Sequence, residues 1–236
     1  MTEKTAEEKS ALIDQTIIGA YEWFKSAPQS AIKDDPQGRT WRDKAKTDMM
    51  DKLTRAPFDF NDLAVAARVG ISLEKEVYRY ARMQKLVGSE HMQKLIQHCI
   101  GGEYQKKLSK GMTIAGEKCY LFGKIDTWWP DRMTDLKTTK AKPGRPFDGE
   151  KYATSFQGIL YSYLNKTKQF DYLVAELEHD STEEKPTIKE VHLVESGFWG
   201  SPEALEKIVI DKITWFIEGL KEDGLWDIYK NQYCLY

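Results

Sequence analysis

Three absences narrow the class of protein. The 236-residue chain has three cysteines, Cys99, Cys119 and Cys234, which lie far apart and form no Cys-x-x-Cys pair. Zinc-ribbon and clustered iron–sulfur sites are therefore poorly supported. No apolar run approaches the roughly 18 residues of a membrane span, and the segment Met1–Lys9 is charged with no apolar core behind it. We therefore expect a cytoplasmic protein without a secretory signal and with reduced thiols.

The chain also lacks a large charge of either sign. Its net charge of −2 gives no global indication of a nucleic-acid partner. Two segments differ, because residues 104–124 and residues 132–145 each hold five cations and one acid, a local charge of +4. Basic patches of this kind bind phosphate, and Lys140, Lys142 and Arg145 are the candidates for nucleic-acid contacts. A solvated lysine face is the alternative.

No internal repeat or low-complexity segment divides the chain, but the hydrophobic period changes near Gly102. Before it, apolar spacing predicts helices, among them residues 11–24, 63–69 and 73–86. After it, the pattern predicts strand, strand, strand, helix, strand, strand and helix, with the first of these helices over residues 151–165. The expected fold class is α/β, a mixed sheet flanked by helices. The expected division is a helical N-terminal region, residues 1–85, and a core, residues 86–236.

Two aspartates are placed to share a cation. Residues 119–139 are typical of a hairpin that turns at Pro130-Asp131. Such a hairpin brings Asp126 and Asp135 to one end of the sheet. Mg²⁺ and Mn²⁺ prefer hard oxygen ligands, which these carboxylates supply. A divalent cation beside a phosphodiester activates the attacking water and offsets the phosphate charge.

A lysine accompanies the second aspartate. Because side chains alternate along a strand, Lys137 shares a face with Asp135, about 7 Å along. An ammonium there can orient water, help to deprotonate it, and offset phosphate charge. Leu136 points to the core, but its carbonyl can reach the metal. The alternative is an ordinary hairpin with two exposed aspartates and a lysine.

The following helix carries two polar side chains one turn apart. Gln157 and Tyr161 are separated by four residues and therefore lie on one helix face. A glutamine can donate to a phosphate or a base, and a tyrosine can stack or form a hydrogen bond. Both are thus candidates for nucleic-acid contacts. A half-buried core position is the alternative for Tyr161.

The series Gly123-x-x-Asp126, Asp135-x-Lys137 and Gln157-x-x-x-Tyr161 resembles the motifs of the PD-(D/E)XK nuclease superfamily. It is most similar to the branch that contains the RecB nuclease domain and RecE-type exonucleases, over residues 86–195. The resemblance implies a restriction-endonuclease-like core. It implies that Asp126 and Asp135 bind the metal, that Lys137 is the catalytic lysine, and that Gln157 and Tyr161 face the substrate.

The resembling family has a further ligand, His or Glu, on a helix before the sheet and shortly after a glycine. Here Gly88-Ser89-Glu90-His91 offers two neighbours, although the spacing is one residue shorter than usual. We assign His91, with Glu90 second and His98 third, while Glu103 is a further candidate. The alternative is that His91 and His98 are an ordinary surface or core pair.

These motifs favour a Mg²⁺- or Mn²⁺-dependent DNA exonuclease of recombination or repair. A sequence-specific endonuclease on the same core is an alternative, although no helix-turn-helix pattern is evident. A catalytically silent DNA-binding module is another. The expected partner is DNA, and we expect no membrane association. A single-strand annealing protein as a partner is implied by the resemblance alone. The sequence leaves open whether the chain forms a homo-oligomer. Relatives with iron–sulfur clusters need four cysteines, and this chain has three.

Overall fold

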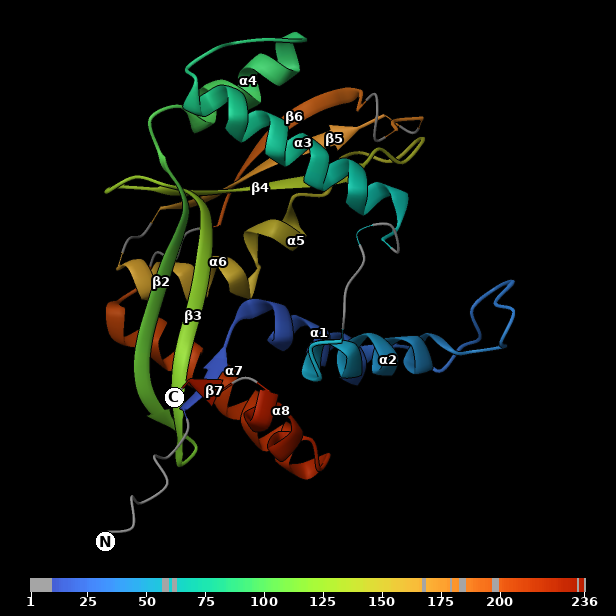
Figure 1. The fold of residues 1–236 in the computed structure, drawn as a ribbon, viewed down its shortest axis with the longest axis vertical. Coiled ribbons are helices and arrows are strands. Elements are labelled where there is room, and N and C mark those ends of the chain that lie inside the picture. Colours follow the sequence, from blue (N-terminus) through green and yellow to red (C-terminus); the bar gives the residue numbers. More distant parts are fainter. Residues whose placement is uncertain are drawn as a thin grey trace, which may run out of the picture. The chain divides into compact units, whose positions relative to one another are not determined.

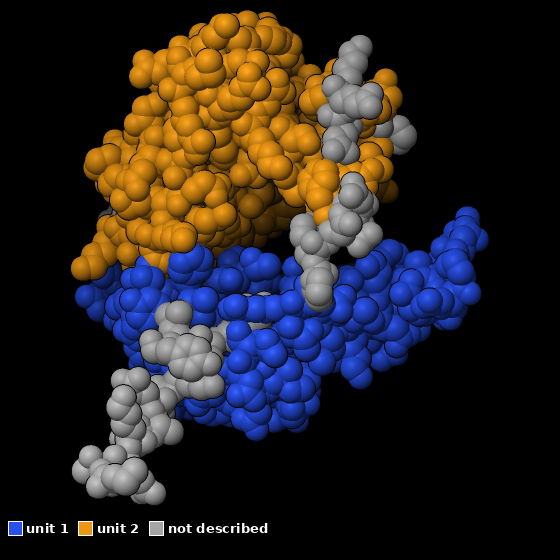
Figure 2. Space-filling model, in the orientation of Figure 1, with its two compact units in different colours: residues 1–57, 109–123, 202–236 blue, residues 58–108, 124–201 orange. Residues whose placement is uncertain are grey.

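The chain forms two compact units, which Figure 2 shows in different colours. The computed structural model describes residues 10–56, 60, 63–166, 169–178, 180–182, 186–196, 200–232 and 234–235. Unit 1 comprises residues 1–57, 109–123 and 202–236, and unit 2 comprises residues 58–108 and 124–201. The division at residue 85 expected from the sequence does not coincide with these boundaries, because the helix that ends at Arg82 packs with the strands of unit 2.

Unit 2 is built on a mixed sheet with the strand order β6-β5-β4-β3 (Figure 1). Strands β4 and β5 are parallel, whereas β3–β4 and β5–β6 are antiparallel. The α/β class with a mixed sheet and flanking helices, expected from the sequence, is therefore confirmed. The strands that lie wholly in unit 2 are β4 (Met133–Lys140), β5 (Phe170–Leu177) and β6 (Ile188–Glu195). The paired strands β2 (Glu103–Ile114) and β3 (Glu117–Trp128) belong to both units, because residues 109–123 are part of unit 1.

Two helices, α3 (Val65–Arg82) and α4 (Glu90–Cys99), pack on one face of this sheet. Their apolar stripes form one buried cluster with β4, β5 and β6, including Val69, Leu73, Val77, Leu95, Ile96, Leu136, Leu173 and Val191. The sequence predicts two helices where the structure has the single helix α3. Gly70 does not break it. An added Cβ at Gly70 would lie 2.5 Å from Thr138 Oγ1, so the glycine permits close packing on β4.

On the opposite face lie α5 (Glu150–Ala153) and α6 (Phe156–Asn165). The sequence predicts one helix over residues 151–165, but the helix is interrupted at Thr154-Ser155. Ser155 is the N-cap of α6, and its hydroxyl accepts a hydrogen bond from the Gln157 N–H at 3.2 Å. Since α6 begins at this cap, the cap sets which side chains of α6 face the sheet.

Gly158 lets α6 approach the end of β6. An added Cβ would lie 2.5 Å from Ser196 Oγ and 2.9 Å from the Ser196 carbonyl oxygen. Because backbone cannot move aside cheaply, we expect Gly158→Ala to lower the free energy of unfolding by about 1–3 kcal/mol, measured by urea denaturation. Gly19→Ala is the matched helical control, because its nearest neighbour lies 3.6 Å away. Equal stability of the Gly158 variant and the wild type would contradict this packing.

Unit 1 gathers the ends of the chain around Tyr21. This ring packs on Trp215 and Phe216, and its hydroxyl donates to Asp223 at 2.7 Å. The elements are β1 (Ser10–Ile13), α1 (Gln15–Ser26), α2 (Trp41–Leu53), α7 (Pro202–Glu222), α8 (Trp226–Gln232) and β7 (Cys234–Leu235). The sequence predicts helix from residue 11, but residues 11–13 form a strand parallel to β3. Pairing with β3 outweighs the local pattern, and helix α1 starts only after its N-cap, Asp14.

The cysteine side chains that the structure describes are buried. Cys99 and Cys119 form no disulfide, and burial raises the pKa of Cys119 to about 11 and that of Cys99 to about 12. Both thiols are therefore protonated near neutral pH. The side chain of Cys234 lies outside the described part of the chain. In the described ranges, no helix is both long enough and apolar enough to cross a membrane.

Candidate functional site

Strands β3 and β4 pair only at their adjoining ends. The pairs are Trp128 with Met133 and Thr127 with Thr134, whereas β4 pairs with β5 along its whole length. The next positions are Asp126 and Asp135, where the ladder stops. There the Leu136 N–H donates to Asp126 Oδ2 at 3.1 Å instead of to a backbone carbonyl. The two aspartates therefore flank the point at which the strands separate.

Asp135 is held from two sides. Its residue exposure is 2%, its Oδ1 accepts from the Gln157 amide at 2.9 Å, and its Oδ2 lies 2.5 Å from Lys137 Nζ. Burial alone would lower the pKa of Lys137, but the charge of Asp135, its hydrogen bond and the charge of Asp126 outweigh burial and raise this pKa. Lys137 is thus cationic at neutral pH, as the sequence-based pairing of Asp135 with Lys137 requires.

A third carboxylate reaches the site from α3. The Gln105 amide nitrogen lies 3.4 Å from Glu74 Oε1 and 3.5 Å from Asp126 Oδ1, so it bridges the two acids. Burial, followed by the charge of Asp135, raises the pKa of Glu74, and Lys137 offsets part of this. Sequence reasoning missed Glu74. The available signal was an acid beside the apolar stripe Leu73–Val77 of the helix that packs on β4.

The three acids make the site strongly anionic. Burial raises the pKa of Asp126 well above its ordinary value, and the charges of Asp135 and Glu74 raise it further. Lys137 and the Leu136 N–H act in the opposite direction without cancelling the effect. Buried like charges are costly unless a cation compensates them. The electrostatics therefore favour a bound cation among these carboxylates.

The donor atoms suit a hard divalent cation. Carboxylate oxygens from three elements converge, and the Leu136 carbonyl points to the same side of β4 as its N–H, toward Asp126. Among the described residues, the one set of three ligand atoms that all lie within 4.8 Å of one another is elsewhere, so Glu74, Asp126 and Asp135 are more widely spaced. Side-chain rotation would be needed for all three to share an ion.

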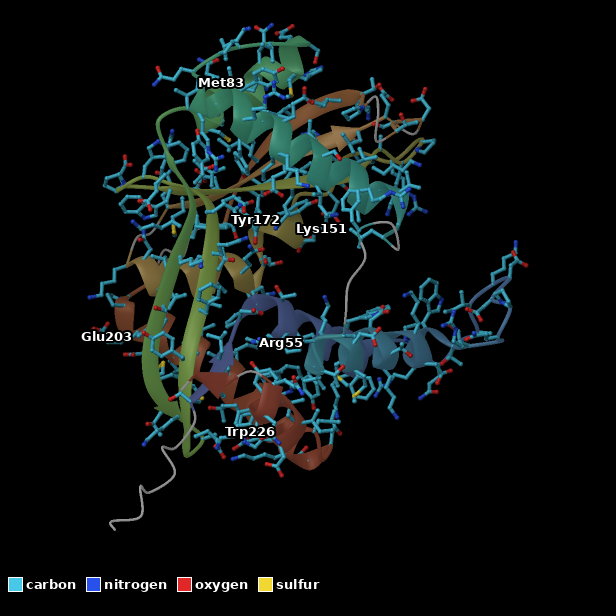
Figure 3. The ribbon with its side chains drawn as sticks, in the orientation of Figure 1. Arg55, Met83, Lys151, Tyr172, Glu203 and Trp226 are labelled. Carbon is cyan, nitrogen blue, oxygen red and sulfur yellow. The ribbon has the colours of Figure 1, made fainter. Side chains whose placement is uncertain are left out.

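Two side chains of α6, Gln157 and Tyr161, form hydrogen bonds with other parts of unit 2. The Gln157 amide oxygen accepts from the Tyr172 hydroxyl at 3.2 Å, and its amide nitrogen holds Asp135. Tyr161 has an exposure of 6%, and its hydroxyl donates to the Lys124 carbonyl at 3.2 Å. Figure 3 labels Tyr172 among the strands of unit 2. Both side chains therefore form hydrogen bonds within the protein. The nucleic-acid contacts expected of Gln157 and Tyr161 from the sequence stay a prediction.

His91 and Glu90 lie in the first turn of α4 and form no hydrogen bond or ion pair with Asp126 or Asp135 in the described part of the chain. Helix α4 packs on α3 and on β6, which is separated from β4 by β5. His98 is partly buried, and burial lowers its pKa, while Glu103 pairs with Lys106. The acid of the helical region that Gln105 connects to Asp126 is Glu74. The ligand role of the four candidates stays a prediction.

The basic candidates lie at the end of β4 and in the segment that follows it. Lys142 and Arg145 are joined by a turn in which the Arg145 N–H donates to the Lys142 carbonyl at 3.1 Å. Both line an open pocket with Lys189 and Glu178. Lys140 lines a neighbouring pocket. Because Lys140 is five residues past Asp135 on β4, the Cα atoms of these two residues lie about 16 Å apart.

The chain was compared with protein families, curated proteins and solved structures. No family model and no curated protein matches the chain. Among solved structures, SSO0001 is 11% identical with a TM-score of 0.42, over 89% of this chain and 78% of that chain. Scheffersomyces stipitis Rai1 is 11% identical with a TM-score of 0.32, over 90% and 61% of the two chains. Candida albicans Rai1, in complex with pU5-Mn²⁺, is 13% identical with a TM-score of 0.30, over 85% and 54%. Likeness at this level carries no argument about activity.

Proposed function

We propose that the chain is a divalent-metal-dependent nuclease that hydrolyses DNA, with a restriction-endonuclease-like core of the PD-(D/E)XK type. The observation that carries the proposal is the convergence of Asp126, Asp135 and Glu74 beside Lys137 at the point where β3 and β4 separate. Each acid comes from a different element, and the raised pKa values of Asp126 and Glu74 indicate charge that a cation would compensate. The Leu136 carbonyl is the backbone candidate for the same ion.

Each group of residues has its own role in the proposed reaction. Asp126, Asp135 and Glu74 would hold Mg²⁺ or Mn²⁺, which when bound activates a water and polarises a phosphate oxygen. Gln157 fixes the Asp135 carboxylate, and Tyr172 in turn fixes Gln157. Lys137 keeps its proton, so it suits orienting the water and offsetting phosphate charge more than abstracting a proton. Lys140, Lys142 and Arg145 would contact the DNA backbone farther along β4.

Exonucleolytic action in recombination or repair is the preferred form of the proposal, on the motif resemblance. A partner single-strand annealing protein and a homo-oligomer belong to the same resemblance. An endonuclease on this core is the alternative mode. A catalytically silent DNA-binding module is less favoured, because a protein that only binds DNA has no need to keep three like charges together in a partly buried site.

The direct test is digestion of an end-labelled linear duplex beside a covalently closed circle, in Mg²⁺, Mn²⁺ or EDTA. We expect metal-dependent loss of the linear DNA alone. Cutting of the circle would indicate an endonuclease, and a labelled RNA of equal length tests the choice of nucleic acid. DNA binding without cleavage of any substrate in either metal would overturn the enzymatic proposal.

Metal should also stabilise the fold. Saturating Mg²⁺, at about 100 times its dissociation constant, adds about 2.7 kcal/mol to the free energy of unfolding. For a chain of this size we expect a rise in Tm of about 5–10 °C over the EDTA-treated protein, measured by differential scanning fluorimetry. Asp126→Asn should raise the metal-free Tm, because one repelling charge is lost, and should abolish most of the response to Mg²⁺. An equal response of variant and wild type would mean that Mg²⁺ binds elsewhere.

A further inference from the structure

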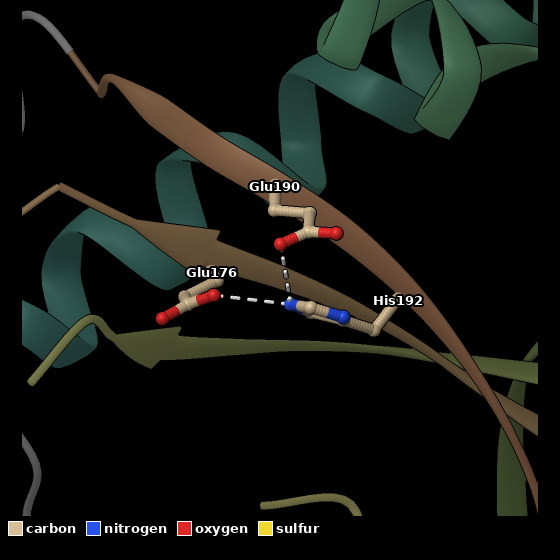
Figure 4. A group of neighbouring side chains, drawn as sticks. All are labelled: Glu176, Glu190 and His192. Carbon is tan, nitrogen blue, oxygen red and sulfur yellow. Dashed lines mark hydrogen bonds and ion pairs between the residues drawn. The ribbon is translucent and has the colours of Figure 1, made fainter. Parts of the chain in front are cut away.

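A second group of metal-ligating side chains lies on β5 and β6. Glu176, Glu190 and His192 each offer one ligand atom, and these atoms all lie within 4.8 Å of one another (Figure 4). His192 Nε2 is 3.0 Å from Glu176 Oε2 and 3.8 Å from Glu190 Oε2. The group contains an imidazole as well as two carboxylates, so it offers the mixed nitrogen and oxygen donors of transition-metal sites.

The sheet register separates this group from the proposed nuclease site. Asp135 pairs with Tyr172, and Glu176 lies four residues farther along β5. Four residues of strand span about 13 Å, whereas the ions of a two-metal catalytic site lie about 3.5–4 Å apart. A cation held by Glu176 and His192 is therefore not a second catalytic ion for Asp135, although both groups lie on the same face of the sheet.

A β-bulge builds the group. Leu177 pairs with Ile188 and Glu176 pairs with Glu190, so Lys189 is an extra residue on β6. Bulges re-aim side chains, and here Lys189 Nζ lies 3.2 Å from Glu176 Oε1. Glu176 and Glu190 become directly opposed like charges across the two strands, an unfavourable pair unless a cation lies between them.

The ligand atoms are well positioned for an ion. The side chain of Glu176 is 4% exposed and that of His192 is 18% exposed. The Phe147 ring stacks on the imidazole, with centroids 3.8 Å apart and planes at 2°, so the plane of the ring is fixed with Nε2 toward both carboxylates. Glu190 is 58% exposed and leaves the group open to solvent.

We propose that Glu176, Glu190 and His192 bind a first-row transition-metal cation of the Zn²⁺ class, with solvent completing its coordination. A doubly charged cation between Glu176 Oε2 and Glu190 Oε2 neutralises the two carboxylates, while Lys189 lies against the other oxygen of Glu176. It joins β5 to β6 beyond the bulge. Because β6 is the last strand in the strand order, such an ion would stabilise the pairing of this edge strand with β5.

The test reads the imidazole directly. The chain has four histidines, and the NMR signals of the labelled imidazoles report each one, with His192→Gln identifying its own signal. Zn²⁺ is titrated in the presence of excess Mg²⁺, which binds imidazole poorly. We expect the His192 signals to shift and to saturate at one equivalent of Zn²⁺. Failure of the His192 signals to respond while other signals move would overturn the proposal.

Two variants make the assignment specific. Glu190→Gln removes one exposed anionic ligand without disturbing the buried Glu176, and should weaken Zn²⁺ binding at His192 at least tenfold. Glu195→Gln changes an exposed glutamate on the same strand and should leave the affinity unchanged. Equal affinity in both variants would make the group an ion-pair network without a metal. DNA cleavage is a separate readout that neither result alters, so this site and the proposed nuclease function stand or fall independently.

Discussion

Asp135→Asn is expected to lower DNA cleavage at least about a thousandfold, equivalent to about 4 kcal/mol of lost transition-state stabilisation. The amide keeps the size of the side chain and can still accept from Gln157, but it removes the charge that faces Lys137 at 2.5 Å and the carboxylate expected to hold metal. The measurement is the rate of loss of end-labelled linear duplex in Mg²⁺. DNA binding, followed by fluorescence anisotropy, should stay within a few fold, because Lys140, Lys142 and Arg145 are unchanged.

The control is Asp180→Asn, an exposed aspartate of unit 2 that lies outside both groups of ligands. It should cleave DNA at the wild-type rate. A circular-dichroism melting curve excludes unfolding as the cause of a loss in Asp135→Asn. Turnover within tenfold of wild type in folded Asp135→Asn would remove this carboxylate from the mechanism, and with it the proposed metal centre.

The pairing of Asp126, Asp135 and Lys137 was predictable because it depends on local sequence. A hairpin with a Pro130-Asp131 turn fixes which residues of neighbouring strands meet, and alternation along β4 fixes which side chains share a face. Helices α2 and α4 each begin at their own N-cap, Thr40 and Ser89, so their starts are also set by local sequence. Local sequence was therefore sufficient to predict that Asp126, Asp135 and Lys137 lie together.

Long-range pairing was not predictable in this way. Strand β1 has four residues, and its pairing with β3 and β7 makes it a strand. Gly70 in α3 resembled a helix break in the sequence, and only packing on Thr138 explains it. The bulge that gathers Glu176, Glu190 and His192 likewise depends on the register between β5 and β6. In each case the missing information was the contact between elements distant along the chain.

The position of Glu74 likewise depends on contacts between elements that are distant along the chain. Two variants compare Glu74 with His91 as the upstream ligand. Glu74→Gln is expected to lower cleavage about a hundredfold or more, because the amide removes one of three carboxylates around the proposed ion. His91→Gln is expected to cleave at close to the wild-type rate, because in the described ranges His91 forms no hydrogen bond or ion pair with Asp126 or Asp135. Both rates are measured on the same linear duplex across a range of Mg²⁺ concentrations.

The metal dependence separates a ligand from a merely nearby acid. Loss of a ligand should raise the Mg²⁺ concentration that gives half-maximal rate, and should also lower the maximal rate. Gln105→Ala removes only the amide that bridges Glu74 and Asp126. It should change the Mg²⁺ concentration for half-maximal rate far less. Gln105 has φ +60°, so Gln105→Gly provides a variant without backbone strain. If His91→Gln abolished cleavage and Glu74→Gln did not, the metal would have to draw its upstream ligand from α4, and the arrangement of α3 over β4 would serve packing alone.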